Sequence, residues 1–482
     1  MAERVVWWVK RDARLYDNEA LSAAVATGVE VLPLYIVEPL VYDGPDWSSV
    51  LSTVYHSALE GLRKNLAHHG SALFVREGEA VTVLEALHRE LPFTALYAHE
   101  ETGLNHTFMR DKAVATWCKK RGVRFYEYQT NGVVRRLKSR DDWQSQFVAA
   151  MGRPLLPIPS PLTLPESTKR LAGRLPALES LTMTSLPVIS ERTAHETLRH
   201  FLYTRGVGYS GGISSMLQAP TACSRLSMHL AWGTVSLKTV FAATERRLAE
   251  LPVDGSMKQW RRSLRAFHSR LFWHSHFVQW LEDMVMMEYE PLNSVFKDAL
   301  PVVMGDEAAR RLHAWEHGQT GYPVIDAAMR YYRETGWLNF RSRAMVTSFA
   351  VHGLRLPWQT MVYALAQRMA DYVPGIHVSQ VQMQTGVTGI NTIRVYSPTK
   401  QQLDHDPNCI FIKRWVPELA SYTTAEIAAF ETEKLGDYVR PIIDFKVESK
   451  IMKDALYSIK KSEIARLESL GVYHKHGSRR TR

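Results

Sequence analysis

The chain has 482 residues, 45% of them hydrophobic, and carries 59 Lys and Arg against 49 Asp and Glu, for a formal net charge of +10. This length allows two or three domains with packed cores, and the composition excludes a disordered or collagen-like chain. The positive charge favours an anionic partner, most simply nucleic acid, although a basic protein without such a partner is the alternative.

The three cysteines, Cys118, Cys223 and Cys409, lie far apart and form no CxxC pair. This pattern is typical of a reduced, cytoplasmic protein and argues against an iron–sulfur cluster, which needs four thiolates. We expect no metal site. The first residues do not form a signal peptide, and no apolar run reaches the ~18 residues of a membrane span.

The first 130 residues alternate short apolar runs with helical patterns, which predicts an α/β domain with a doubly wound parallel sheet. The predicted strands are 5–9, 29–36, 72–75, 95–98 and 123–128, and the predicted helices are 21–26, 51–68, 80–91 and 107–120. No GxGxxG follows the first strand, so the dinucleotide-binding fingerprint is absent. The block 8–21, WVKRDARLYDNEAL, is a strand ending in a charged turn, with Asp17 or Asn18 capping the next helix.

Residues 131–193 change in character and predict an interdomain linker. A basic run is followed by five prolines, which deny regular helix or sheet: Pro154, Pro157, Pro159, Pro161 and Pro165. Apolar residues between the prolines favour an ordered crossing over a flexible one.

From residue 194 to 482 the strand runs stop and helical periodicity dominates, which predicts an all-helical domain able to enclose a large cofactor. The predicted helices are 226–247, 256–288, 308–317, 323–335, 341–353, 358–369 and an amphipathic segment at 451–470. A short basic end, 475–482, follows and either contacts phosphates or frays.

Three clusters in this part indicate an anionic ligand. Tyr209 lies in a Gly-rich turn, and Cys223-Ser224-Arg225-Leu226-Ser227 precedes a helix whose free N–H groups would suit a diphosphate; a plain serine cap is the alternative.

The second cluster is a helical stretch around residues 267–276. Phe267, Arg270 and His274 share one face, and Trp273 and His276 border it. Taken alone, this pattern also describes a solvated helix edge.

The third cluster is Arg341 and Arg343 at a helix start, with Asp371 downstream. An Arg–Asp pair beside an anionic ligand offsets its charge while the acid holds the cation, although such pairs more often serve structure alone.

Four blocks at characteristic spacing carry a family resemblance: WEHGQTGYPVIDAAMR at 315–330, GWLNFRSR at 336–343, DYVPGIH at 371–377 and RWVPEL at 414–419. With block 8–21 they resemble the photolyase/cryptochrome family. The resemblance implies FAD held non-covalently in the helical domain. It also implies either of two functions: light-driven electron donation to a pyrimidine dimer in DNA, or blue-light signalling with the same cofactor.

The resemblance also implies residue roles. The implied FAD contacts are Tyr209, Cys223, Ser224, Arg225, Leu226, Ser227, Phe267, Arg270, Arg343, Asp371, Tyr372, Val373 and His377. The implied reaction pocket is Arg270, His274, Asn339, His377 and Met383, and the implied DNA contacts are Trp273, His276, Arg341 and Arg394. Residues 99–103 and Asn105 lie where some relatives contact an antenna chromophore, a folate or deazaflavin, and an ordinary loop is the equal alternative.

Departures from the family pattern make this a divergent member. Arg270 stands where many enzymes acting on cyclobutane dimers have glutamate, Phe340 where they have asparagine, and Met383 where they have tryptophan. Of the family's tryptophan relay only Trp358 matches, so an internal relay would have to be rerouted. The candidates are Trp337, Trp315, Tyr363 and Tyr372, and plain core packing is the favoured alternative for each.

We therefore expect a bacterial-type DNA photolyase without an iron–sulfur cluster. It would be cytoplasmic and monomeric and would use FAD and blue light to repair pyrimidine dimers, cyclobutane dimers rather than 6-4 photoproducts. A cryptochrome-type photoreceptor is the alternative.

Overall fold

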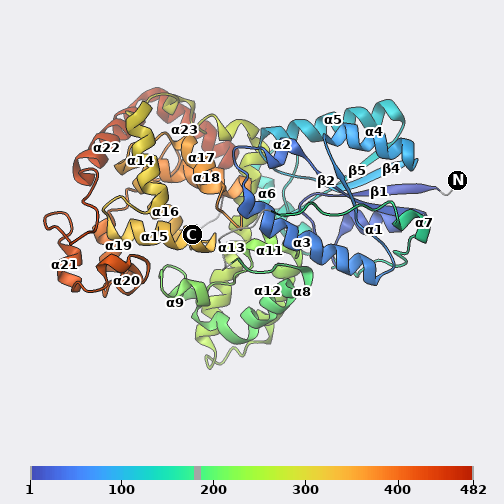
Figure 1. The fold of residues 1–482 in the computed structure, drawn as a ribbon, viewed down its shortest axis with the longest axis horizontal. Coiled ribbons are helices and arrows are strands. Elements are labelled where there is room, and N and C mark those ends of the chain that lie inside the picture. Colours follow the sequence, from blue (N-terminus) through green and yellow to red (C-terminus); the bar gives the residue numbers. More distant parts are fainter. Residues whose placement is uncertain (1–2, 179–185, 480–482) are drawn as a thin grey trace.

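The computed structural model describes residues 3–178 and 186–479, and it has an α/β part at the N-terminus and a larger helical part (Figure 1). Residues 179–185 of the predicted linker lie outside the described residues. Both predicted fold classes are confirmed.

The sheet has five parallel strands in the order β3-β2-β1-β4-β5. Their bounds are β1 Arg4–Val9, β2 Glu30–Val37, β3 Phe74–Glu77, β4 Ala95–His99 and β5 Arg124–Tyr128. The central strand β1 pairs on both sides, with Trp8 opposite Leu34 in β2 and Ala98 in β4. All five strands were predicted, with bounds that differ by one or two residues.

Helices cover both faces of this sheet: α1 Glu19–Val25, α2 Pro39–Tyr42, α3 Ser49–His68, α4 Ala80–Glu90 and α5 Asn105–Arg121. Side chains of β1 alternate between the faces, so Trp7 enters the core beneath α1 and α3, and Trp8 enters the core beneath α4 and α5. This two-sided burial explains why the strands are apolar throughout.

The capping residue of α1 is Asn18, whose Oδ1 accepts from the Leu21 amide at 2.9 Å. Asp17, the other candidate, has φ of 52° and instead forms an ion pair of 2.8 Å with Lys238. The turn after β1 therefore fastens the α/β part to the helical part.

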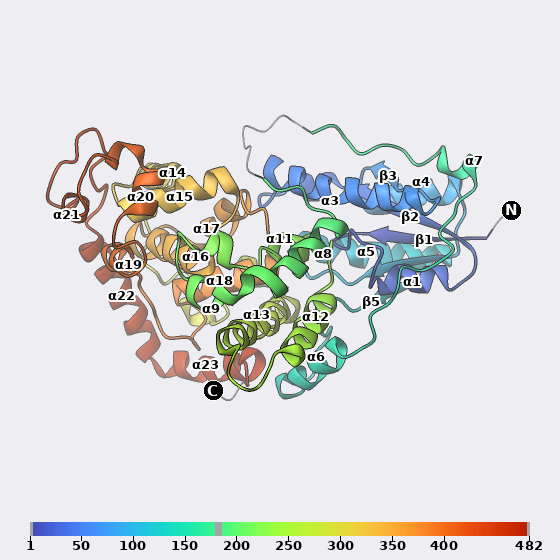
Figure 2. The same ribbon diagram turned by 90° about the horizontal axis from the view of Figure 1, so that it is seen from below.

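The segment after β5 contains a 3₁₀ helix at Arg140–Asp142, α6 Trp143–Met151 and α7 Glu166–Lys169. The sequence did not predict α6, but the proline-rich stretch 154–165 carries neither helix nor strand, as expected. The stretch lies along the N-terminal domain (Figure 2), where Leu164 and Val75 amides bond to Gly70 and Ala172 carbonyls.

The remaining described elements are helical. Their bounds are α8 Glu191–His200, α9 Tyr209–Gly212, α10 Ala219–Ala222, α11 Ser227–Ala231, α12 Leu237–Glu250, α13 Lys258–Asp283, α14 Gly305–His317, α15 Pro323–Thr335, α16 Phe340–Ser348, α17 Trp358–Ala366, α18 Pro374–Thr385, α19 Pro398–His405, α20 Ile410–Trp415, α21 Thr424–Ala428, α22 Phe445–Lys461 and α23 Glu463–His476. Shorter π and 3₁₀ turns are Phe201–Arg205, Gly206–Gly208, Val285–Glu288, Ser294–Phe296, Phe349–Gly353 and Pro417–Leu419.

The predicted helix 226–247 is in fact two helices, α11 and α12, separated at Gly233. Gly233 has φ of +68°, and a Cβ there would lie 2.0 Å from the Arg11 carbonyl oxygen. The backbone after β1 thus passes directly against this turn, a contact that periodicity cannot reveal. The predicted segment 451–470 likewise spans two helices, α22 and α23.

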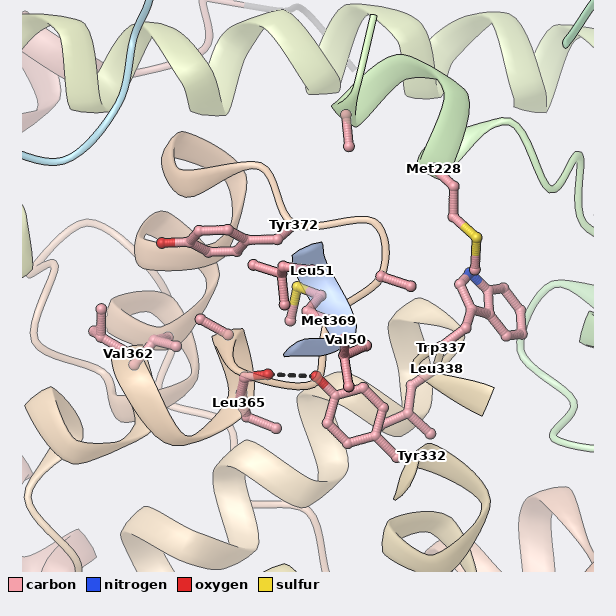
Figure 3. Packing of buried hydrophobic residues seen from close by; sticks show 14 of the residues in the cluster. Val50, Leu51, Met228, Tyr332, Trp337, Leu338, Val362, Leu365, Met369 and Tyr372 are labelled. Carbon is pink, nitrogen blue, oxygen red and sulfur yellow. Dashed lines mark hydrogen bonds between the residues drawn. The ribbon is translucent and has the colours of Figure 1, made fainter. Parts of the chain in front are cut away.

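One hydrophobic core runs from the sheet into the helical part. In Figure 3, Val50 and Leu51 of α3 lie near Met369, and the Tyr332 hydroxyl donates to the Leu365 carbonyl. Among the described residues, no helix is both long enough and apolar enough to cross a bilayer.

Candidate active site

Arg343 and Asp371 form a close ion pair in the helical part. Arg343 Nη2 donates to Asp371 Oδ1 at 2.7 Å and Oδ2 at 2.8 Å, and Nε donates to the Leu338 carbonyl at 2.9 Å. The Asp371 side chain is 3% exposed and that of Arg343 is 26% exposed. The acid therefore fixes the cation from behind and leaves part of the guanidinium accessible.

Arg343 is positioned by the start of α16. Asn339 caps this helix, because its Oδ1 accepts from the Ser342 amide at 3.0 Å while its Nδ2 donates to the Ile213 carbonyl at 3.0 Å. Both ends of the amide are thus occupied, and Asn339 is buried. Asn339 therefore caps and orients α16, and its catalytic role stays a prediction.

Residues 223–226 lie between α10 and α11, and Ser227 begins α11. Arg205 holds it by donating to the carbonyls of Thr221, Cys223 and Ser224. Leu226 N donates to Ser224 Oγ at 3.3 Å. Sequence reasoning missed Arg205, because an arginine in a π-helical turn has no motif of its own.

Arg225 is the cationic residue within this segment. Its backbone has φ of +61°, its guanidinium lies 4.0 Å from the ring of Trp337, and its Nη1 is buried without a hydrogen-bond partner. Burial lowers the pKa of Arg225. The negative charge of Asp371 opposes this shift, and the positive charge of Arg343 adds to it. Burial raises the pKa of Cys223 to about 11, opposed by Arg225, Arg205 and Arg343.

The structure thus brings the 223–225 segment together with the Arg343–Asp371 pair. The charges of Asp371 and Arg343 act on Arg225, and those of Arg205, Arg225 and Arg343 act on Cys223, so this place has a local excess of positive charge. Such a place suits a diphosphate or an anionic ring.

Helix α13 supplies the second predicted cluster. Phe267 is buried against Tyr209 and Phe201, with ring centroids 5.6 Å and 4.7 Å apart. Burial raises the pKa of Tyr209, and Arg270, which hydrogen-bonds to its hydroxyl, opposes that rise. One turn further along, both ring nitrogens of His274 are buried without a partner, and burial lowers its pKa to about 4. His274 is therefore a neutral imidazole at pH 7.

His276 does not lie where a DNA contact is possible. It is 1% exposed, Arg140 donates to its Nδ1, and its ring packs 5.7 Å from Trp143 and 5.4 Å from Trp280. We therefore withdraw its predicted DNA contact, since its ring is enclosed by aromatic side chains. Trp273 is only half-buried and stacks on Phe277 at 5.7 Å.

The block 371–377 continues into α18. His377 is buried, its Nε2 lies 2.9 Å from the Val362 carbonyl, and burial lowers its pKa to about 4. Tyr372 lies edge-on to it at 5.8 Å, and Val373 precedes α18 as its N-terminal flanking residue. Met383, later on α18, is half-buried, with Sδ 3.6 Å from Gln380 Nε2.

A group of cations borders this region. Arg341 Nη1 donates to the Tyr396 hydroxyl at 3.4 Å, and its guanidinium lies 5.3 Å from the ring of Phe340. Arg270 and Arg394 are exposed. Among the described residues, none of Arg270, Arg341 and Arg394 forms an ion pair with a carboxylate. Cations without an acidic partner favour an external anion.

The three tryptophans predicted for electron transfer are all buried: Trp315, Trp337 and Trp358. Trp315 Nε1 donates to the Val346 carbonyl at 3.1 Å, and Trp337 lies beside Met228 (Figure 3). Their electron-transfer role stays a prediction.

A different aromatic series connects the two parts of the protein. Trp232 stacks on Tyr55 at 4.8 Å and meets Trp47 edge-on at 5.7 Å, and its Nε1 donates to the Ala370 carbonyl at 2.7 Å. It therefore joins α3 and its flank to the segment that carries Asp371. The sequence could not reveal this series, because its members are far apart in the chain.

A cavity of about 550 Å³, which includes adjoining solvent, opens at the carboxyl ends of the strands and is lined by Tyr42, Trp47, Glu101 and Gly103 among others. A second, of about 530 Å³, is lined by His99, Glu100, Glu101 and Thr102. The predicted antenna loop thus borders both cavities, and His99 lines a third as well. The backbone N–H of Asn105 donates to Glu288 Oε1 at 3.0 Å. The carboxyl ends of parallel strands are the usual place for a ligand in such a fold.

Comparison with known proteins identifies the two parts. A family model described as the FAD binding domain of DNA photolyase matches residues 267–458, and one described as DNA photolyase matches residues 5–144. Together they cover more than half of the chain. The chain belongs to the photolyase/cryptochrome family.

Individual relatives cover nearly the whole chain. A deoxyribodipyrimidine photo-lyase from Synechococcus is 25% identical, covering 97% of this chain and 99% of that protein. A cryptochrome DASH from Gloeobacter violaceus is 24% identical, covering 94% and 95%. The crystal structure of a class III photolyase from Agrobacterium tumefaciens has the same fold, with a TM-score of 0.80 at 23% identity over 96% of this chain and 98% of that one.

The residues present fit FAD. The matched FAD-binding domain contains the Arg343–Asp371 pair, and the unpartnered Arg225 Nη1 and both unpartnered His274 nitrogens are buried polar atoms that a polar cofactor could satisfy. FAD is the cofactor of this protein.

Proposed function

We propose that this protein is a blue-light-driven, FAD-dependent DNA photolyase that repairs UV-induced pyrimidine dimers, with cyclobutane dimers preferred over 6-4 photoproducts. The observation that carries the proposal is the Arg343–Asp371 pair, held inside the FAD-binding domain and bordered by arginines without acidic partners. Curated relatives named deoxyribodipyrimidine photo-lyase support it.

In this proposal FAD, when bound, supplies the light-driven electron, and the protein binds and orients the partners. Arg343 faces the negative charge of the cofactor and Asp371 keeps the guanidinium in place. Ser224, Arg225, Leu226 and Ser227, pinned by Arg205, face the diphosphate. Neutral His274 places unpartnered ring nitrogens at the cofactor without adding charge, and Arg341 and Arg394 hold flanking phosphates.

The second candidate function is that of a blue-light photoreceptor with the same cofactor. It is favoured by similarity to a relative named cryptochrome DASH. A receptor would show light-dependent association with a protein partner and no preference for damaged DNA.

A two-lesion repair assay tests the proposal. The purified protein, with its flavin chemically reduced, is illuminated with blue light in the presence of oligonucleotides carrying either a cyclobutane dimer or a 6-4 photoproduct. We expect the cyclobutane dimer to be restored to unmodified pyrimidines in a light-dependent manner. Failure to restore either lesion, with the flavin spectrum intact, would overturn the proposal in favour of the receptor.

A further inference from the structure

We infer that Phe340 is a wedge that enters the DNA base stack beside the lesion and stacks on the base that the departing dimer leaves uncovered. The inference rests on the proposed function, since it specifies how the same site takes its DNA. The sequence marked Phe340 only as a departure from the family pattern, where many enzymes acting on cyclobutane dimers have asparagine, and gave it no role.

Phe340 is exposed in a place where a folding role does not explain it. It is the first residue of α16 and is 42% exposed, whereas Ala344, Met345 and Val346 on the same helix are buried. Its ring therefore contributes little to the core and is available to a partner.

Two cations from different helices flank the ring. The guanidinium of Arg270, on α13, lies 5.4 Å from its centroid, and that of Arg341, on α16, lies 5.3 Å away. Arg341 also lies 5.6 Å from the ring of Tyr396. An exposed aromatic ring among unpaired arginines combines base stacking with phosphate contact, the pairing typical of nucleic-acid surfaces.

The helix turn that carries the ring is also held in place. Asn339, its chain neighbour, bonds to the Ser342 amide and to the Ile213 carbonyl, so the first turn of α16 is tied to a different part of the fold. A wedge must be rigid, because a mobile side chain would yield to the base stack instead of parting it.

Phe340 lies close to the residues of the proposed flavin and lesion site. Arg343, one turn along α16 from Phe340, forms the pair with Asp371. His274, with its unpartnered nitrogens, lies one turn along α13 from Arg270. A dimer that reaches this region must leave the duplex, and an aromatic side chain beside the vacated place replaces the stacking that is lost.

The test compares the holoprotein with Phe340→Leu and Phe340→Tyr variants in the dark, on the same lesion in a duplex and in a single strand. Phe340→Leu keeps an apolar side chain but removes the ring, so we expect duplex affinity to fall about tenfold while single-strand affinity changes about twofold or less. Phe340→Tyr keeps the ring and should restore duplex binding. The flavin absorbance of each variant reports that the fold is intact.

Phe108→Leu is the matched control. Phe108 is 38% exposed on α5, with Lys112 Nζ 5.5 Å from its ring, so it is a similar exposed aromatic residue next to a cation in the other domain. We expect this variant to bind both substrates as the unmodified protein does.

Two outcomes would overturn the wedge. In one, Phe340→Leu behaves like Phe108→Leu. In the other, it weakens duplex and single-strand binding equally, as expected of a simple wall of the pocket. If the unmodified protein does not prefer lesion-containing DNA over undamaged DNA, the proposed function is wrong, and the wedge inference, which rests on it, is wrong as well.

Discussion

The Arg343–Asp371 pair is the residue-scale feature on which FAD binding is expected to depend most. Asp371 is almost fully buried, and removing one partner of such a pair leaves the other without compensation at a cost of about 3–5 kcal/mol. The Arg343 side chain is 26% exposed, so part of it remains available to an anionic ligand.

We predict that Asp371→Asn retains its fold but loses FAD affinity by at least about tenfold, because the amide cannot hold Arg343 in place or balance it. The ratio of flavin to protein absorbance after purification measures this. Glu418→Gln is the control, because Glu418 also accepts two bonds from one arginine, Arg330, at 2.9 Å and 2.7 Å. Equal flavin loss in both variants would contradict a specific role for Asp371.

A second residue-scale feature is the acidic group around Arg110. Arg110 donates to Glu38 Oε1 at 2.9 Å and also contacts Glu101 and Asp111. Lys10 contacts Asp111, so this group holds three carboxylates and two cations. Burial raises the pKa of Glu38 to about 7, opposed by Arg110 and reinforced by Glu101 and Asp111.

This raised pKa predicts a stability that falls as pH rises from about 4.5 to 7. Folded Glu38 retains a proton that the unfolded chain releases, so its contribution is complete below the unfolded pKa and is lost as pH rises through the folded pKa, by up to roughly 3 kcal/mol. Glu38→Gln cannot titrate, so its melting temperature should vary less between pH 5 and pH 8 than that of the unmodified protein. If the melting temperatures of the two proteins change with pH in parallel, Glu38 is ionised across this pH range and the prediction is wrong. Burial also raises the pKa of Glu100 to about 7, but Glu100 is present in both proteins and affects the pH dependence of both melting temperatures equally.

At the scale of elements, the turn between α11 and α12 determines how the two parts meet. Gly233 permits contact with the Arg11 backbone, and Arg11 in turn lies 4.8 Å from the Trp232 ring and donates to the Tyr372 carbonyl at 2.8 Å. A turn in the helical part is therefore shaped by a loop of the sheet.

We predict that Gly233→Ala destabilises the protein by several kcal/mol, because the new Cβ would meet backbone that cannot move aside, at a φ that alanine disfavours. Thermal unfolding measures the loss. Gly211→Ala is the control, since no atom lies within 4 Å of its added Cβ, and it should change the melting temperature little. Similar melting temperatures for the two variants would mean that the loop after β1 can yield.

At the scale of the whole molecule, the net charge of +10 takes on meaning through the arginines that lack acidic partners. Many of the other arginines are paired within the fold, as in the Arg330–Glu418 and Arg343–Asp371 pairs. Two of these arginines, Arg270 and Arg341, flank Phe340 close to the proposed flavin site, so we expect DNA phosphates to be held there.

We predict that Arg341→Gln and Arg394→Gln each weaken lesion-DNA binding and reduce the slope of log affinity against log salt by about one. A titration at several salt concentrations measures the slope. Lys119→Gln on α5, an exposed cation at the other end of the molecule, should leave the slope unchanged. An equal reduction by Lys119→Gln would indicate diffuse attraction instead of a defined contact surface.

The sequence by itself determined the five strands, most helices and the family, whereas its choice of flavin-site residues stays a prediction. Apolar periodicity and short motifs are local, and the physical chemistry of a strand, a helix start or an Arg–Asp pair can be read within a few residues. Only the tertiary structure decided the split at Gly233, the capping role of Asn339, the burial of His276, the hold of Arg205 on the 223–224 carbonyls and the exposure of Phe340. Each of these depends on which distant segment packs against the residue, and burial and hydrogen bonding between distant segments leave no periodic trace in the chain.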